Sequence, residues 1–318
     1  MTRRTYLALS VLIFSLGVAL SLPARPALSG EQVHGTWTIE PLPVADSVEV
    51  TLRVSSDHHN MTNSSAVSIA QFRGITAAQM QASPSARFEI VRDAGTFQCE
   101  GYLKGGSGGG TFVFVPSEKF VSEMRSLGYD GLSSDMVFAM AVHDVSTAYV
   151  RDLHGLGIKP VAEQLIAMKI HGVSADFVRQ IQSLGYSDLN ADKLVAMRIH
   201  GVTPDFVREL KDLHYNPKLD ELIAMKIHGV TSDMARDLRS QGYDASMDQM
   251  IAMRIHGASP EFMKEVKALG YDHPSIDQLI TMRIHGVTPE FIQKAQSKGM
   301  RNLSIDQLVS MRIHGVLD

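Results

Sequence analysis

Met253-Arg254-Ile255-His256-Gly257 is one copy of a five-residue phrase that decides the fold of this chain. Five further copies of Met-(Lys/Arg)-Ile-His-Gly occur, and successive copies start 28 or 29 residues apart. They begin at Met168, Met197, Met225, Met282 and Met311. A weaker copy, Met140 to Asp144, lies 28 residues before the first. A constant period of this length is typical of stacked repeats, which present surfaces more often than they build one reactive centre.

Each repeat is predicted to contain two short helices. The first begins with a hydroxyl residue, often followed by proline and an acid, as in Thr203-Pro204-Asp205. The hydroxyl caps an unpaired N–H, proline has no N–H to leave unpaired, and the acid meets the positive end of the helix dipole. This helix is expected to end at a glycine that adopts the left-handed conformation. The glycines concerned are Gly128, Gly185, Gly242, Gly270 and Gly299.

The second helix of each repeat runs into the five-residue phrase. Ser246-Met247-Asp248-Gln249 fits a capping box at its start. We expect the Met and Ile of the phrase to pack in the core, the basic residue and His to meet the negative dipole end, and Gly to turn the chain. Helices of about ten residues are unstable alone, so neighbouring repeats must bury their apolar faces. Seven such units fit between residues 117 and 318 and predict an α-solenoid.

Two departures from the repeat are informative. His214 replaces the glycine that ends a first helix, and it marks a candidate bend or weak point because a non-glycine residue in the left-handed region costs energy. Asp144 replaces the glycine of the phrase in the weaker copy. This suggests an atypical unit that caps the array against the preceding domain.

Residues 30–116 are predicted to form a small, mainly antiparallel β domain, so the fold class is α+β. Alternation of apolar and polar residues predicts strands at 47–54, 87–91, 96–103 and 111–115, with Trp37 and Cys99 in the core. Thr76 is expected to cap one short helix. Residues 57–65 and the glycine-rich stretch 104–110 are predicted to be loops.

The first 29 residues resemble a signal peptide. Arg3 and Arg4 precede the uncharged run Tyr6–Leu22, and Ala27-Leu28-Ser29 has the small residues of a cleavage site. We therefore expect an exported protein, periplasmic or extracellular, with no membrane span after cleavage. The alternative is an uncleaved N-terminal anchor.

Composition and motifs argue against several function classes. A net charge of -4 gives no electrostatic reason to expect a nucleic-acid partner. The single cysteine excludes an internal disulfide. No zinc-protease helix, nucleophile elbow or P-loop is present, so we expect neither an enzyme nor a cofactor.

Ladders of repeated polar residues have two interpretations. Single histidines from adjacent units should lie about 10 Å apart, too far to form one zinc site, so no metal is expected. The basic residues of the phrase either stabilise helix ends or form a stripe that grips an acidic partner. These candidate partner-binding residues are Lys169, Arg198, Lys226, Arg254, Arg283 and Arg312. An acidic series comprises Asp192, Asp220, Asp248, Asp277 and Asp306.

The sequence resembles a bacterial exported repeat family. The resemblance rests on Ile284–Phe291, which reads Ile-His-Gly-Val-Thr-Pro-Glu-Phe, on the Leu-Gly-Tyr phrases and on Val91–Phe97, and it covers residues 34–318. Similar segments are appended to some membrane metallopeptidases of the beta-lactam-sensing antirepressor type. The peptidase part is absent here, so the resemblance implies an accessory or sensing role and no catalytic or metal residue.

These observations favour an exported, non-enzymatic scaffold that binds a protein or peptide. The alternative is a structural envelope protein that associates with itself. That alternative rests on the C-terminal repeat, where Leu308, Val309 and Ile313 are expected to leave an apolar end that pairs with another copy.

Overall fold

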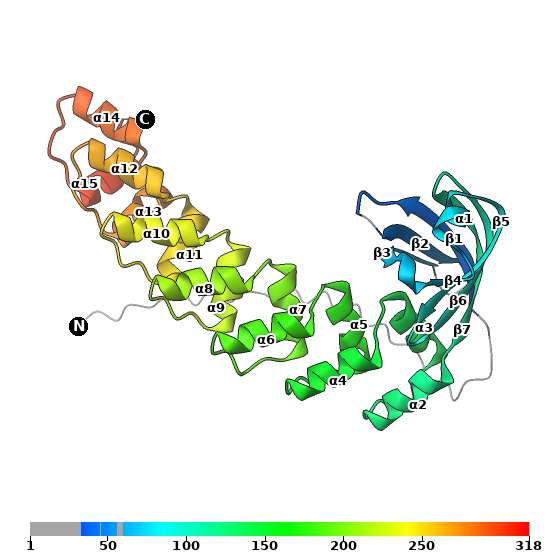
Figure 1. Ribbon diagram of the computed structural model, residues 1–318. Coiled ribbons are helices and arrows are strands. Elements are labelled where there is room, and N and C mark those ends of the chain that lie inside the picture. Colours follow the sequence, from blue (N-terminus) through cyan, green and yellow to red (C-terminus); the bar gives the residue numbers. More distant parts are fainter. Residues whose placement is uncertain (1–32, 45, 56–59, 318) are drawn as a thin grey trace.

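Figure 1 shows the computed structural model, a curled antiparallel sheet followed by a long helical array. It describes residues 33–44, 46–55 and 60–317. The predicted signal peptide lies outside these ranges. The predicted α+β class and the antiparallel β domain are confirmed.

The sheet has seven strands in the order β3-β2-β1-β7-β6-β5-β4, and all neighbours are antiparallel. Trp37 is buried, and its Nε1 donates to the carbonyl of Thr111 at 3.0 Å. Cys99 is also buried, and burial raises the pKa of its thiol, as expected for a structural cysteine. The strands are β1 (Val33–Pro41), β2 (Ser47–Ser55), β3 (Asn60–Ser68), β4 (Phe72–Arg73), β5 (Ala82–Arg92), β6 (Gly95–Lys104) and β7 (Ser107–Pro116).

Two predicted loops are wrong in part. Residues 60–65 belong to strand β3, which pairs with β2 and joins Ser64 to Thr51 through their hydroxyls at 2.7 Å. An edge strand needs only one paired neighbour, so this polar segment can join the sheet. Gly108, Gly109 and Gly110 lie within β7, and only Gly105 and Gly106 turn the chain with positive φ. A Cβ at Gly110 would lie 1.9 Å from the carbonyl oxygen of Glu100, so close strand approach requires glycine there.

The short helix α1 (Ala77–Gln81) begins at Thr76 as predicted, with a complete capping box. From Glu118 onward, seven helix pairs follow one another in the described residues. The first helices are α2 (Glu118–Ser126), α4 (Thr147–Gly155), α6 (Ala175–Ser183), α8 (Pro204–Asp212), α10 (Ser232–Ser240), α12 (Pro260–Ala268) and α14 (Pro289–Ser297). The second helices are α3 (Ser134–Val142), α5 (Ala162–Ile170), α7 (Ala191–Ile199), α9 (Leu219–Ile227), α11 (Met247–His256), α13 (Ile276–Ile284) and α15 (Ile305–Ile313).

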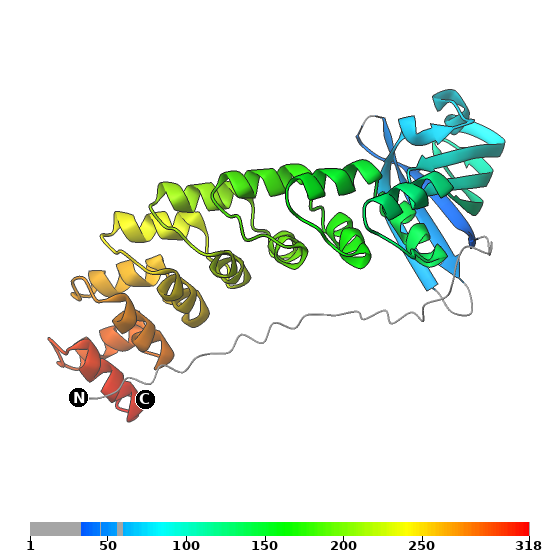
Figure 2. The same ribbon diagram turned by 90° about the horizontal axis from the view of Figure 1, so that it is seen from below.

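The two kinds of helix form two rows, because each first helix contacts the next first helix and each second helix contacts the next second helix. The array is curved, and in Figure 2 the second helices α5 to α9 are seen end on along its inner side. The predicted caps are present: the Thr203 hydroxyl accepts from the N–H of Phe206, and Ser246 forms its capping box. His214 and Asp144 adopt φ values of 61° and 54°, so both take the left-handed position of the glycines that they replace.

A second period of two units is superimposed on the repeat. The hydroxyls of Tyr129, Tyr186 and Tyr243 donate to the carbonyls of Pro160, Pro217 and Pro274 at 2.8, 2.8 and 2.9 Å. Each of these bonds joins residues 31 apart, and the tyrosines are themselves 57 residues apart. Alternate junctions between units therefore carry an additional hydrogen bond that the single-repeat pattern does not reveal.

The first unit packs directly on the sheet. The Phe138 ring of α3 lies 5.2 Å from Phe114 and 6.1 Å from Phe97, measured between ring centroids. Asp144, which replaces the glycine of the phrase in this unit, also contributes to the contact, because its carboxylate lies 3.0 Å from Nη1 of Arg92 in β5. No helix in the described ranges is long and apolar enough to cross a membrane.

Candidate interaction surface

The predicted basic stripe is held against the array itself. Five of its six cations lie over an aromatic ring on the first helix of the same unit, at 4.8–5.4 Å from the ring centroid. The pairs are Lys169 on Tyr149, Arg198 on Phe177, Lys226 on Phe206, Arg283 on Phe262 and Arg312 on Phe291. Arg254 has no such ring because Met234 occupies the corresponding position.

The same cations also reach the preceding unit. The Nε of Arg198 donates to the carbonyl of His171 at 3.3 Å, in the turn that ends α5. A Cβ added at Gly172, Gly229 or Gly257 would lie 3.1–3.2 Å from Nη2 of Arg198, Arg254 or Arg283, so these guanidinium groups cover the preceding turns. A cation at a helix C-terminus is favourable because it meets the negative end of the dipole. The geometry therefore supports the structural interpretation of these residues, and their partner-binding role stays a prediction.

The histidines of the phrase lie at the ends of the second helices, and five of the six are exposed. Of these six histidines, only His314 forms a ring hydrogen bond among the described residues, and its Nδ1 lies 2.7 Å from the Ser310 carbonyl oxygen. No group of three or more His, Cys, Asp or Glu side chains that could hold a metal occurs in the ranges that the structure describes.

The isoleucine of the phrase is not in the core, which corrects the expectation that Met and Ile both pack. Five of the six methionines are fully buried and Met311 is partly buried, whereas every one of the six isoleucines is about half exposed. Because each residue turns an α-helix by about 100°, an isoleucine two residues after the buried methionine points away from the core. We call these six residues the isoleucine ladder: Ile170 (54% exposed), Ile199 (54%), Ile227 (47%), Ile255 (48%), Ile284 (52%) and Ile313 (57%).

The isoleucine ladder is the main exposed apolar feature of the part of the chain that the structure describes. Eleven large hydrophobic side chains are exposed in the described ranges, and six of them are these isoleucines. The residue one turn earlier, such as Ile166 or Val195, is half-buried in four of the six helices and widens the apolar strip. Scattered exposed apolar residues are normal, but a contiguous row of them is typical of an interaction surface.

A row of carboxylates accompanies the isoleucine ladder. Each acid lies seven residues before an isoleucine, two helical turns away and on the same face. All six are exposed, and none forms an ion pair among the described residues. Asp192 and Asp277 accept hydrogen bonds from Gln164 and Gln249 of the preceding units. We call this series the carboxylate row: Glu163, Asp192, Asp220, Asp248, Asp277 and Asp306.

In the first unit, the equivalent face of the second helix is buried against the sheet. Phe138 and Val142 of α3 occupy the positions of Ile166 and Ile170, and they are only 7% and 4% exposed. Aromatic side chains of strands β6 and β7 contact Phe138, and α3 packs against both strands. The second-helix face is therefore suited to pack against extended polypeptide.

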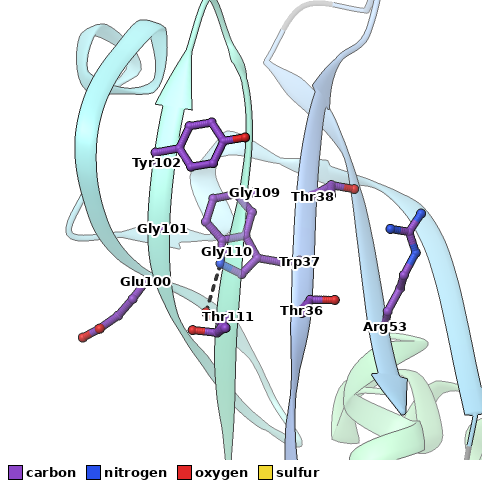
Figure 3. A pocket seen from close by; sticks show the side chains of 10 residues that line it. All are labelled: Thr36, Trp37, Thr38, Arg53, Glu100, Gly101, Tyr102, Gly109, Gly110 and Thr111. Carbon is purple, nitrogen blue, oxygen red and sulfur yellow. Dashed lines mark hydrogen bonds between the residues drawn. The ribbon is translucent and has the colours of Figure 1, made fainter.

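The outer face of the sheet carries an open depression, shown in Figure 3. Tyr102 is 60% exposed beside it, and Gly109 and Gly110 form part of its floor. Its charged side chains, Arg53 and Glu100, come from different strands and lie at opposite ends.

The C-terminal end differs from the expectation for self-association. Leu308 and Val309 are 0% and 8% exposed, because they pack inside the last unit. Only Ile313 of the three predicted residues is exposed, and Val316 lies near it with 42% exposure.

No known family model matches this chain, and no curated protein matches it.

Proposed function

We propose that this protein is an exported, non-enzymatic scaffold that binds a protein or peptide partner along the isoleucine ladder. The observation that carries the proposal is the repeated exposure of one apolar residue in six consecutive units. The exposed half of each isoleucine contributes nothing to the core of its own unit. A partner that covers the row would gain the free energy of burying it, roughly 25 cal/mol per Å² of apolar surface.

The first unit supports the same proposal. There the sheet covers the equivalent face of α3, so a polypeptide surface of this protein already packs on it. The proposal of export is based on the N-terminal sequence, and the proposal of an accessory role in envelope sensing is based on the family resemblance. The self-association alternative depends on Ile313 and Val316 alone, since Leu308 and Val309 are buried.

A capture experiment with matched variants tests the proposal. The full chain is compared with the triple variant Ile199→Ser, Ile227→Ser, Ile255→Ser, using the envelope fraction of the source cells. The control carries Arg179→Ser, Arg208→Ser and Arg236→Ser, which change exposed residues of the first-helix row. We expect a specific captured protein with the wild type and the control, and its loss with the ladder variant. Equal capture by all three folded proteins would contradict the proposal.

A further inference from the structure

We infer that the isoleucine ladder and the carboxylate row together bind an extended segment of the partner, with an apolar side chain at every third position and lysine or arginine between them. This inference rests on the proposed function and specifies the chemistry of the partner. It follows from the spacing of the isoleucines, the curvature of the array and the charge beside the ladder.

The spacing of the ladder favours a polyproline-II-like segment. Successive second helices contact each other directly, so equivalent residues lie about 8–10 Å apart. A polyproline II helix has three residues per turn and rises about 3.1 Å per residue, so its same-face residues recur every ~9.3 Å. A β-strand repeats its same face every ~6.6–6.8 Å and would fall out of register after one or two units.

The curvature of the array argues against a helical partner. An α-helix presents equivalent residues every seven positions, about 10.5 Å apart, which also approximates the spacing of the ladder. However, the second helices follow a curve in Figure 2, and an α-helix is nearly straight. An extended segment without internal hydrogen bonds can bend at each residue and follow the curve.

Both charges occur beside the ladder: a carboxylate lies two turns before each isoleucine, and a basic residue directly precedes it. The six carboxylates are exposed and form no ion pair among the described residues. The basic residues keep their charge, but five of the six are held over aromatic rings of the first helices, as Arg198 is over Phe177 and Lys226 over Phe206. A peptide along the ladder would place its lysine or arginine side chains within reach of the carboxylates, because these side chains have long flexible stems. The complementary partner is therefore basic and apolar.

The test uses a defined peptide and the full chain. The probe is a fluorescent 16-residue peptide of repeated Leu-Lys-Pro that ends in Leu, so that apolar side chains recur at every third position. One control peptide has the same composition in shuffled order, and another replaces lysine with glutamate. We expect the probe to bind at least about tenfold more tightly than either control, measured by fluorescence anisotropy at about 0.1 M salt.

Variants of the protein separate the apolar and electrostatic contributions. The triple change Ile199→Ser, Ile227→Ser, Ile255→Ser should weaken the probe at least about tenfold, because each isoleucine loses its buried surface. Asp220→Asn, Asp248→Asn and Asp277→Asn together should weaken it about fivefold, since exposed charge pairs are individually weak. The matched control Asp176→Asn, Asp205→Asn, Asp233→Asn changes exposed aspartates of the first-helix row and should leave affinity within about twofold.

Three results would overturn the inference: equal binding of the shuffled peptide, equal binding of the glutamate peptide, or a dimer of this chain that the ladder variant abolishes. The result of the peptide-binding test can be distinguished from the result of the capture experiment. If the captured envelope protein requires the ladder but the peptides bind alike, the surface binds a partner of different chemistry. If capture is independent of the ladder, the proposed function fails as well.

Discussion

The second helix of the first unit and the second helices of the later units have the same fold but different surroundings. In α3, Phe138 packs against aromatic side chains of the sheet, and Val142 is buried. In α9, the equivalent residues are Ile223, which is half-buried, and Ile227, which is 47% exposed. The comparison teaches that one helix face serves as an internal packing surface once and is left uncovered in six further units.

The largest expected difference is in stability. Phe138→Ala should lower the free energy of unfolding by about 3–5 kcal/mol, because it removes a buried ring from the junction between α3 and the sheet. Ile227→Ala should cost only about 0.5 kcal/mol, because this side chain is half exposed. Urea denaturation of both variants measures the difference. Equal losses would show that the two faces do not differ in packing.

The junction between α3 and the sheet also contains an ion pair between Arg92 and Asp144. The Arg92 side chain is 7% exposed and lies 3.0 Å from the Asp144 carboxylate. Asp144→Asn preserves a residue type that tolerates positive φ but removes the charge, so we expect a loss of about 1–3 kcal/mol in urea denaturation. The matched change Asp176→Asn affects an exposed pair with Arg179 and should cost at most about 0.5 kcal/mol. A smaller effect at Asp144 than at Asp176 would argue against the junction as described.

The basic residues allow a closer comparison between two later units. Arg283 lies over the Phe262 ring at 5.1 Å, whereas the position equivalent to Phe262 in the unit of Arg254 is Met234. Arg283→Gln should therefore cost about 0.5–1 kcal/mol more than Arg254→Gln, the usual magnitude of an exposed cation–π contact. Thermal denaturation measures this difference. If both changes leave stability intact but weaken partner binding, the stripe contacts the partner and does not merely support the helices.

The smallest expected difference is a dependence on pH. Burial lowers the pKa of His143, at the end of α3, below the usual value of about 6.5. The unfolded chain therefore binds more protons than the fold as pH falls below about 6.5, and stability declines in that range. His143→Gln should reduce the loss of urea stability between pH 7.5 and pH 5.5, whereas His200→Gln, in the exposed series, serves as the control. An unchanged pH dependence in His143→Gln would exclude this contribution.

Much of the array could be predicted because its signals are local. The period, the hydroxyl caps and the glycines act within one or two turns, so Thr203, Ser246 and Gly185 identify helix ends without knowledge of the packing. The exposed orientation of the Ile227 side chain can also be predicted, because its position relative to Met225 follows from helix geometry. The expected burial was wrong because an apolar residue on a helix need not face the core.

Other features depend on contacts between distant residues. Strand β3 is rich in Ser, Thr and Asn, and only its pairing with β2 reveals that it belongs to the sheet. The packing of Phe138 on Phe114 and the bond from Tyr186 to Pro217 join separate units or domains. No pattern within a single repeat contains this information. The contacts of the basic residues also lie outside the repeated phrase. The phrase alone therefore does not indicate whether these residues support the helices or form a binding stripe.

Site-specific photo-crosslinking in the source cells tests most directly whether the isoleucine ladder is the partner surface. A photoreactive amino acid is placed at position 227 in the ladder or at position 208 on the first-helix row, both of which are exposed. We predict a discrete crosslinked partner from position 227 and none from position 208. Crosslinking of that partner from position 208 and not from position 227 would contradict the account.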